Sequence, residues 1–89
     1  MLAQVKGSDI IYEIEEGTGD NLLNEDIEEG YVDYIYYSVY SSLEAYNNGK
    51  EEIDGGMILL KIYYIDLTPE EILEKVEEFE NVKLEVIEE

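Results

Sequence analysis

Carboxylates are the commonest side chains in this sequence that could take part in chemistry. The 89 residues include 24 aspartates and glutamates and five lysines, with no histidine, cysteine or arginine, which gives a net charge of −19. Without those three residue types the chain lacks Ser-His-Asp and Cys-His nucleophilic systems, histidine and cysteine zinc sites, and arginine clamps on phosphate. No glycine-rich phosphate-binding motif occurs either. We therefore expect no enzyme and no cofactor.

Two kinds of chemistry could still use carboxylates alone. A pair of them can hydrolyse a glycosidic bond, but so many acids single out no pair, and a chain of this length leaves little room for a sugar-binding cleft. A cluster of them can bind a hard cation, and the segment 16–30 is rich in such oxygen ligands. Its spacing does not match an EF-hand loop, so we interpret it as a solvated acidic loop and predict no metal site. The acids of this loop are Asp20, Glu25, Asp26, Glu28 and Glu29.

The net charge itself suggests a function in binding. A net charge of about 2–8 is ample to keep a small domain soluble, and this chain far exceeds it. Because a nucleic acid is a dense array of negative charges, a carboxylate surface can imitate it and occupy a basic groove. We predict a basic protein surface as the partner, such as that of a nucleic-acid-binding protein, and expect binding neither to nucleic acid nor to membranes. The residues expected to contact this partner are the five loop acids and Glu70, Glu74, Glu77 and Glu78.

Tyrosines offer a second candidate surface. Nine occur, most of them between residues 31 and 64. One interpretation is that they fill half-buried sheet positions, because the apolar ring of tyrosine can be buried while its hydroxyl contacts water. The other is an exposed aromatic face for a partner or a homodimer, since tyrosine is enriched at interfaces. That face would carry Tyr34, Tyr36, Tyr40 and Tyr63.

The clearest secondary-structure signal is a helix over residues 69–80. Thr68 is a suitable N-cap, Pro69 suits the first helical position, and Glu71 completes a capping box. Apolar residues then recur at helical spacing on one face, with Asn81 as the C-terminal stop. The predicted core-facing residues are Ile72, Leu73, Val76 and Phe79, followed by a final strand over 82–88.

A long β-hairpin is predicted over about 31–46 and 51–65. Both segments are rich in β-branched and aromatic residues, and Asn48-Gly49 between them is a strong type I′ turn signal. Centring the hairpin there places Val39 opposite Ile58, with a bulge expected at Gly55-Gly56. A helical face that ends at Asn47-Asn48-Gly49 also fits Val32, Ile35, Val39, Leu43 and Tyr46. The crowding of Tyr, Val and Ile side chains favours a strand for 31–40, whereas for 41–47 both alternatives stay open.

The N-terminal part completes the predicted fold. Ile10, Tyr12 and Ile14 alternate with neighbours that include Glu13 and Glu15, which is a strand pattern, and 2–6 forms another strand before a turn at 7–8. One helical turn is expected over 22–27. The sequence thus predicts one α+β domain over 1–89, with an antiparallel sheet of four to five strands and one helix packed on a face. No signal peptide or membrane span is evident, so we expect a cytoplasmic protein.

In size, charge and absence of catalytic residues, the whole chain resembles the small acidic DNA-mimic inhibitors of mobile elements, the anti-restriction and anti-CRISPR proteins. The resemblance implies an inhibitor from a phage or another mobile element. It involves no motif, and those proteins share no common fold, so it assigns a role to no individual residue. The stretches GTGDNLLNEDIEEGYVDYIYY and EIDGGMILLKIYYIDLT are also similar to small uncharacterised proteins of mobile elements in Gram-positive bacteria, a family that implies no assigned activity.

Overall fold

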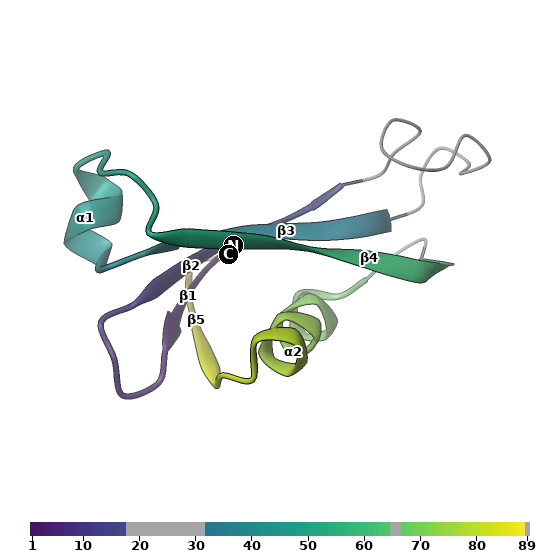
Figure 1. Ribbon diagram of the computed structural model, residues 1–89. Coiled ribbons are helices and arrows are strands. Elements are labelled where there is room, and N and C mark those ends of the chain that lie inside the picture. The colour runs from purple at the N-terminus through teal and green to yellow at the C-terminus, as the bar shows by residue number, and fades with distance from the viewer. Residues whose placement is uncertain (18–31, 65–66, 89) are drawn as a thin grey trace.

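A five-stranded antiparallel sheet with one long helix across one of its faces forms the protein (Figure 1). The computed structural model describes residues 1–17, 32–64 and 67–88. Its elements are β1 (Leu2–Val5), β2 (Ile11–Gly17), β3 (Val32–Tyr40), α1 (Leu43–Asn47), β4 (Asp54–Tyr64), α2 (Pro69–Glu80) and β5 (Leu84–Glu88). The strands lie in the order β4-β3-β2-β1-β5, so β4 and β5 are the two edges. The predicted α+β class is confirmed.

The two faces of the sheet have different surroundings. The helix face, which α2 covers, carries a cluster of buried side chains. The open face, on the other side, carries the alternate residues of the same strands, because side-chain direction alternates along a strand. The helix-face cluster consists of Ala3, Tyr12, Ile14, Ile35, Tyr37, Val39, Leu67, Ile72, Val76 and Leu84.

The connection between β3 and β4 differs from the predicted two-residue turn. Residues 43–47 form the short helix α1, whose N-cap is Ser42, with its hydroxyl accepting a hydrogen bond from the Ala45 amide at 3.0 Å. Gly49, at φ 69°, follows this helix, and the amides of Gly49 and Lys50 bond back to the carbonyls of Tyr46 and Ala45. This pair of bonds is the Schellman arrangement of a helix C-terminus. Asn48-Gly49 therefore ends a helix, and the helical alternative for 41–47 is correct.

The register of the hairpin moves with its turn. Val39 lies opposite Asp54 and Ile35 opposite Ile58, four positions away from the predicted pairing on β4. Because four is an even number, the side chains of residues 34–39 and 54–59 keep their predicted faces. The irregularity in the ladder lies between Val32 and Tyr34, and not at Gly55-Gly56 as predicted.

The helix α2 begins and ends as predicted. The Thr68 hydroxyl accepts from the Glu71 amide at 3.2 Å, the Glu71 carboxylate accepts from the Thr68 amide at 3.1 Å, and Asn81 adopts the left-handed conformation at φ 56°. Ile72 and Val76 are buried against the sheet.

The prediction that Phe79 faces the core is wrong, because its side chain is 57% exposed. Phe79 lies about 60° round the helix from Val76, whereas Glu80 lies only about 40° away on the opposite flank. Glu80 is half-buried and accepts hydrogen bonds from two tyrosines of the sheet. In the last turn of α2, the contact with the sheet is therefore made by this carboxylate and not by the phenyl ring.

The strands near the two ends of the chain agree with the sequence-based predictions. The strands β1, β2 and β5 and the turn at Gly7, which has φ 80°, are as predicted. The acidic loop, including the helical turn expected over 22–27, lies outside the described residues. Within the described part of the chain, no helix is long and apolar enough to cross a membrane.

Candidate functional site

The outer side of α2 carries one of the two predicted surfaces. Glu70, Glu74 and Glu78 are exposed there, and Glu77 is half-buried. They follow one another at spacings of four, three and one residues, so they form a stripe along the helix. Glu70, in the first turn, also lies where the helix dipole favours a negative charge. The structure therefore brings the four predicted helix acids together on one side of a well-capped helix.

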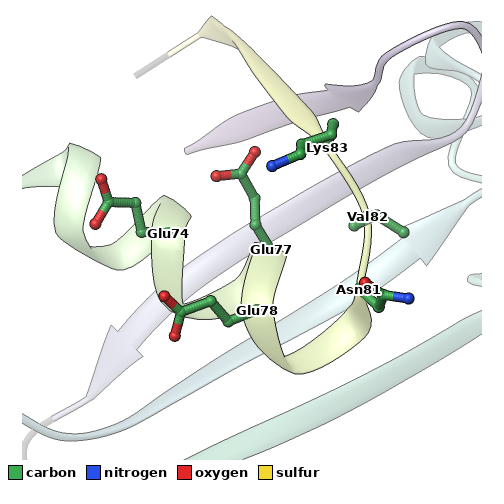
Figure 2. Close-up of a pocket in the computed structure, with 6 residues that line it drawn as sticks. All are labelled: Glu74, Glu77, Glu78, Asn81, Val82 and Lys83. Atoms are coloured by element: carbon green, nitrogen blue, oxygen red, sulfur yellow. The ribbon is translucent and has the colours of Figure 1, made fainter.

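Glu77 links this stripe to the sheet edge. Its carboxylate accepts a hydrogen bond from the Leu84 amide at 2.9 Å, at the start of β5. Figure 2 shows the Lys83 side chain extending towards Glu77 across an open hollow beside the helix. Lys83 thus lies at the border of the stripe. The hollow is lined by Glu74, Glu77, Glu78, Asn81, Val82 and Lys83.

The open face carries the second predicted surface. Tyr34, Tyr36 and Tyr40 of β3 share this face, and the Tyr34 and Tyr36 rings lie 5.7 Å apart between centroids. Tyr63 lies in β4, but its side chain is outside the described part of the structure. Met57 and Leu59, opposite Tyr36 and Tyr34 on β4, are 45% and 50% exposed and extend the patch. We call these residues, Tyr34, Tyr36, Met57 and Leu59, the open-face patch.

The other end of the open face is covered by α1. The Tyr46 ring from α1 meets Tyr40 edge-on with centroids 5.1 Å apart, and its hydroxyl donates to the Glu13 carboxylate at 2.7 Å. Ile11, next to Tyr40 in the register, is fully buried although it lies on the open face. Tyr40 therefore packs within the protein, whereas Tyr36, Met57 and Leu59 of the open-face patch are exposed to solvent.

Glutamates of β2 act as acceptors for the open-face tyrosines. The Tyr36 hydroxyl donates a short hydrogen bond to Glu15, its direct neighbour across β2 and β3. This bond raises the pKa of Tyr36, and the bond to Glu13 raises the pKa of Tyr46 in the same way. For Tyr40, burial is the main cause of its raised pKa. All three phenols therefore stay neutral well above neutral pH.

A tyrosine pair that sequence reasoning missed lies beneath α2. The Tyr12 and Tyr37 rings stack with centroids 5.5 Å apart, and both hydroxyls donate to the Glu80 carboxylate, at 3.3 and 2.6 Å. Burial, and then the charge of Glu80, raises the pKa of Tyr12 to about 12. Burial and the bond to Glu80 raise the pKa of Tyr37 as well. We call Tyr12, Tyr37 and Glu80 the tyrosine clamp.

Local sequence patterns contain little signal for these tyrosine–glutamate contacts. Phe79 fits the apolar pattern of the helix, so the pattern does not indicate that Glu80 beside it contacts the sheet. Glu13 and Glu15 were correctly placed on a strand, but their tyrosine partners follow from a β2–β3 register that spans the 14-residue segment 18–31. The contact between Tyr46 and Glu13 depends on the helix α1, and the sequence leaves helix and strand open for that segment. An excess of acids over lysines is the one signal that tyrosine hydroxyls would serve as donors.

The acidic groups of the described residues occupy both sides of the sheet. The stripe on α2 lies on the helix-face side, whereas Glu13 and Glu15 lie on the open face. Residues 1–17, 32–64 and 67–88 contain no group of three or more acids placed to hold a metal ion. The five predicted loop acids lie outside the described residues. What the described arrangement can do chemically is attract cations and present aromatic and apolar surface.

No protein-family model, curated protein or solved structure matches this chain.

Proposed function

We propose that this chain is a non-enzymatic acidic binding protein that occupies the basic groove of a nucleic-acid-binding protein. The observation that supports the proposal best is the stripe of glutamates on α2. From Glu70 to Glu78 the helix rises about 12 Å, so the mean spacing of the four residues along the axis is about 4 Å. A single strand of duplex DNA carries one phosphate per about 3.4 Å. The stripe thus has nearly the linear charge density of one strand.

The stripe lies on a rigid helix, which reduces the entropy lost when it binds a partner. The capping box and the left-handed Asn81 fix both ends of α2, and Ile72 and Val76 hold its inner side against the sheet. Carboxylates on a rigid element lose less conformational entropy on binding than those on a mobile chain. On the open face, in contrast, the carboxylates of Glu13 and Glu15 already accept hydrogen bonds from tyrosines.

Displacement of a nucleic acid tests the proposal. A fluorescently labelled DNA duplex is bound to each of a panel of purified basic-groove DNA-binding proteins, and its anisotropy is followed as this protein is added. We expect release of the duplex from at least one member, with an apparent affinity that falls steeply between about 50 and 200 mM salt. Release from no member, or an affinity indifferent to salt, would show that the proposal is wrong.

A charge-matched pair of variants locates the contact. The triple variant Glu70→Gln, Glu74→Gln, Glu78→Gln removes three exposed charges from the stripe, and Glu44→Gln, Glu51→Gln, Glu52→Gln removes three exposed charges near α1. Three lost pairs at about 0.5–1 kcal/mol each predict at least tenfold weaker competition for the first variant. The second should change little. Equal losses would mean that net charge, and not the stripe, determines binding.

We also propose a second candidate function, because the open-face patch is exposed: docking or homodimerisation through aromatic contacts. Size-exclusion chromatography with light scattering gives the oligomeric state. A dimer that Tyr36→Ala dissociates, and that added salt does not, supports this function. A monomer that still displaces DNA supports the first.

A further inference from the structure

A glycine on β2 lets a tyrosine ring lean across the open face. Gly17 lies directly opposite Tyr34 in the β2–β3 register, and a Cβ at Gly17 would overlap the outer end of the Tyr34 ring. Residues directly opposite each other in an antiparallel pair project from the same face of the sheet. The end of the Tyr34 ring therefore lies over the backbone of β2, so one side of the ring rests on the sheet and the other is turned away from it.

The Tyr36 ring lies beside the Tyr34 ring. Their centroids are 5.7 Å apart, and their planes meet at 31°. A flat group stacked between two rings needs about 3.5 Å on each side, or roughly 7 Å between the ring centroids, so a third group does not fit between these two. A partner can therefore contact the pair only on its outward surface.

A carboxylate borders the two rings. Glu15, opposite Tyr36 on β2, is exposed and accepts a hydrogen bond from the Tyr36 hydroxyl through Oε2. A carboxylate offers about four acceptor sites on its two oxygens, so this bond orients Glu15 and leaves acceptor sites for a partner. Aromatic surface and a negative charge thus lie side by side. We call Tyr34, Tyr36 and Glu15 the ring–carboxylate platform.

We propose that the ring–carboxylate platform binds an arginine side chain of a different protein. A planar guanidinium can stack on tyrosine rings through a cation–π contact and can also donate two parallel hydrogen bonds to a carboxylate. A lysine ammonium is a point charge without this fork of donors, so it fits the platform less well. The proposal rests on the second candidate function, docking through the open-face patch, and names the group that docks there.

The composition of the chain argues against a second copy as the source of this side chain. The chain contains no arginine, and two copies of charge −19 repel each other. Glu13, two residues before Glu15 on the same face of β2, adds negative potential beside the platform. The charge complement of this surface is therefore a cationic segment of another protein.

Two apolar side chains indicate what should flank the arginine. Met57 and Leu59 are exposed and lie opposite Tyr36 and Tyr34 on β4. Neighbouring strands are about 4.8 Å apart, so these side chains lie roughly 10 Å from Glu15, on the other side of β3. A partner whose guanidinium lies beside Glu15 can therefore bring adjacent apolar residues over Met57 and Leu59. We expect the partner segment to carry an arginine between apolar residues.

Titration of the isotope-labelled full chain with short peptides, followed by NMR, tests the proposal. The probe is acetyl-Leu-Arg-Leu-amide, and two matched peptides replace its arginine by lysine or by citrulline, which has the shape of arginine without the charge. At about 150 mM salt, we expect the arginine peptide to shift the amide signals of the platform and of Gly17. Binding should be about threefold weaker with lysine and about tenfold weaker with citrulline. Shifts confined to α2, or equal binding of either matched peptide, would overturn the proposal.

Two neighbouring glutamates on opposite faces provide a matched pair of variants. Glu15→Gln removes the charge of the platform, and Glu16→Gln removes the same charge from an exposed residue on the other face. We expect about fivefold weaker binding of the arginine peptide for the first and little change for the second. Equal losses would mean that net charge determines binding, and the platform would be wrong.

A third variant moves a ring without removing it. Gly17→Ala displaces the Tyr34 ring from β2, so we expect weaker binding of the arginine peptide with an unchanged circular dichroism spectrum. Unchanged peptide binding in this variant would overturn the platform, and Glu15→Gln still decides if Gly17→Ala does not fold. If the wild type binds no arginine peptide but forms a dimer that Tyr36→Ala dissociates, arginine recognition is wrong and the second candidate function stands.

Discussion

The two faces of the sheet use the same chemical contact in opposite environments. On the helix face, Tyr12 and Tyr37 are 5% and 3% exposed and donate to Glu80. On the open face, Tyr36 is 37% exposed and donates to Glu15. A buried hydroxyl that loses its acceptor has no water to replace it, whereas an exposed one does. The clamp therefore stabilises the fold, and the open-face contacts orient side chains that stay accessible to a partner.

The tyrosine–glutamate hydrogen bonds on both faces reflect the composition of the chain. With 24 acids and five lysines, most carboxylates cannot pair with an ammonium group. Tyrosine supplies a donor without a positive charge, so it satisfies a carboxylate and leaves the net charge unchanged. The nine tyrosines of this acidic chain can therefore bond to carboxylates without reducing its negative charge.

The largest expected difference between the faces is the loss of a carboxylate. Glu80→Ala leaves two buried hydroxyls without acceptors, so we expect the free energy of unfolding to fall by about 2–4 kcal/mol. Glu15→Ala removes an exposed acceptor and should change it by less than about 1 kcal/mol. Urea unfolding followed by circular dichroism measures both.

A conservative variant checks the reason for this difference. Glu80→Gln keeps an acceptor for the hydroxyls and should recover part of the loss. Equal effects of Glu80→Ala and Glu15→Ala would contradict the distinction between the two faces.

Two glycines provide a second comparison. A Cβ at Gly56 would overlap the end of the Tyr37 ring, and a Cβ at Gly17 would overlap the Tyr34 ring. The Tyr37 ring is held by Glu80 beneath α2, whereas Tyr34 lies on the open face and can swing into solvent. We expect Gly56→Ala to destabilise the protein by about 1–3 kcal/mol and Gly17→Ala by less. Thermal melts of both variants provide the test, and a larger effect at Gly17 would show that the open-face ring is fixed.

Local signals were enough to predict the elements, because their causes lie within a few residues. The capping box at Thr68 and the left-handed Asn81 fixed the bounds of α2, and alternation fixed the strands β2 and β5. The faces of residues 34–39 on β3 and 54–59 on β4 are also predictable, since there they depend on alternation alone.

Pairing across the chain was not predictable to the same degree. Asn48-Gly49 suits both a type I′ turn and a helix C-terminus, because both need a positive φ at Gly49. The choice depends on Ser42 as a cap and on the bonds that close α1. For the same reason the glutamate stripe on α2 followed from the sequence, whereas the tyrosine clamp, which joins residues 12, 37 and 80, did not.

The tyrosine clamp should also make the stability of the protein depend on pH in the alkaline range. The pKa of Tyr12 is about 12 in the folded protein and 10.0 for an ordinary tyrosine, so the folded state holds its proton where the unfolded state loses it. The stability that Tyr12 contributes is therefore complete below about pH 10 and is lost as the pH rises through about 12. Melting temperatures between these pH values should fall less steeply for Tyr12→Phe than for the wild type. A parallel decline in both would mean that Tyr12 does not contribute to the alkaline transition.

The smallest effect is expected for the hydroxyl of Tyr36. Tyr36→Phe keeps the ring beside Tyr34 and removes only an exposed hydrogen bond, after which Glu15 is solvated by water, so stability should change by less than about 0.5 kcal/mol. Tyr37→Phe removes the equivalent hydroxyl from the clamp and serves as the matched control, with an expected loss of about 1–2 kcal/mol. Urea unfolding of the two variants gives the ratio directly. If Tyr36→Phe proves as damaging as Tyr37→Phe, the open face is part of the stabilising core. It would then be a poor candidate for a binding surface.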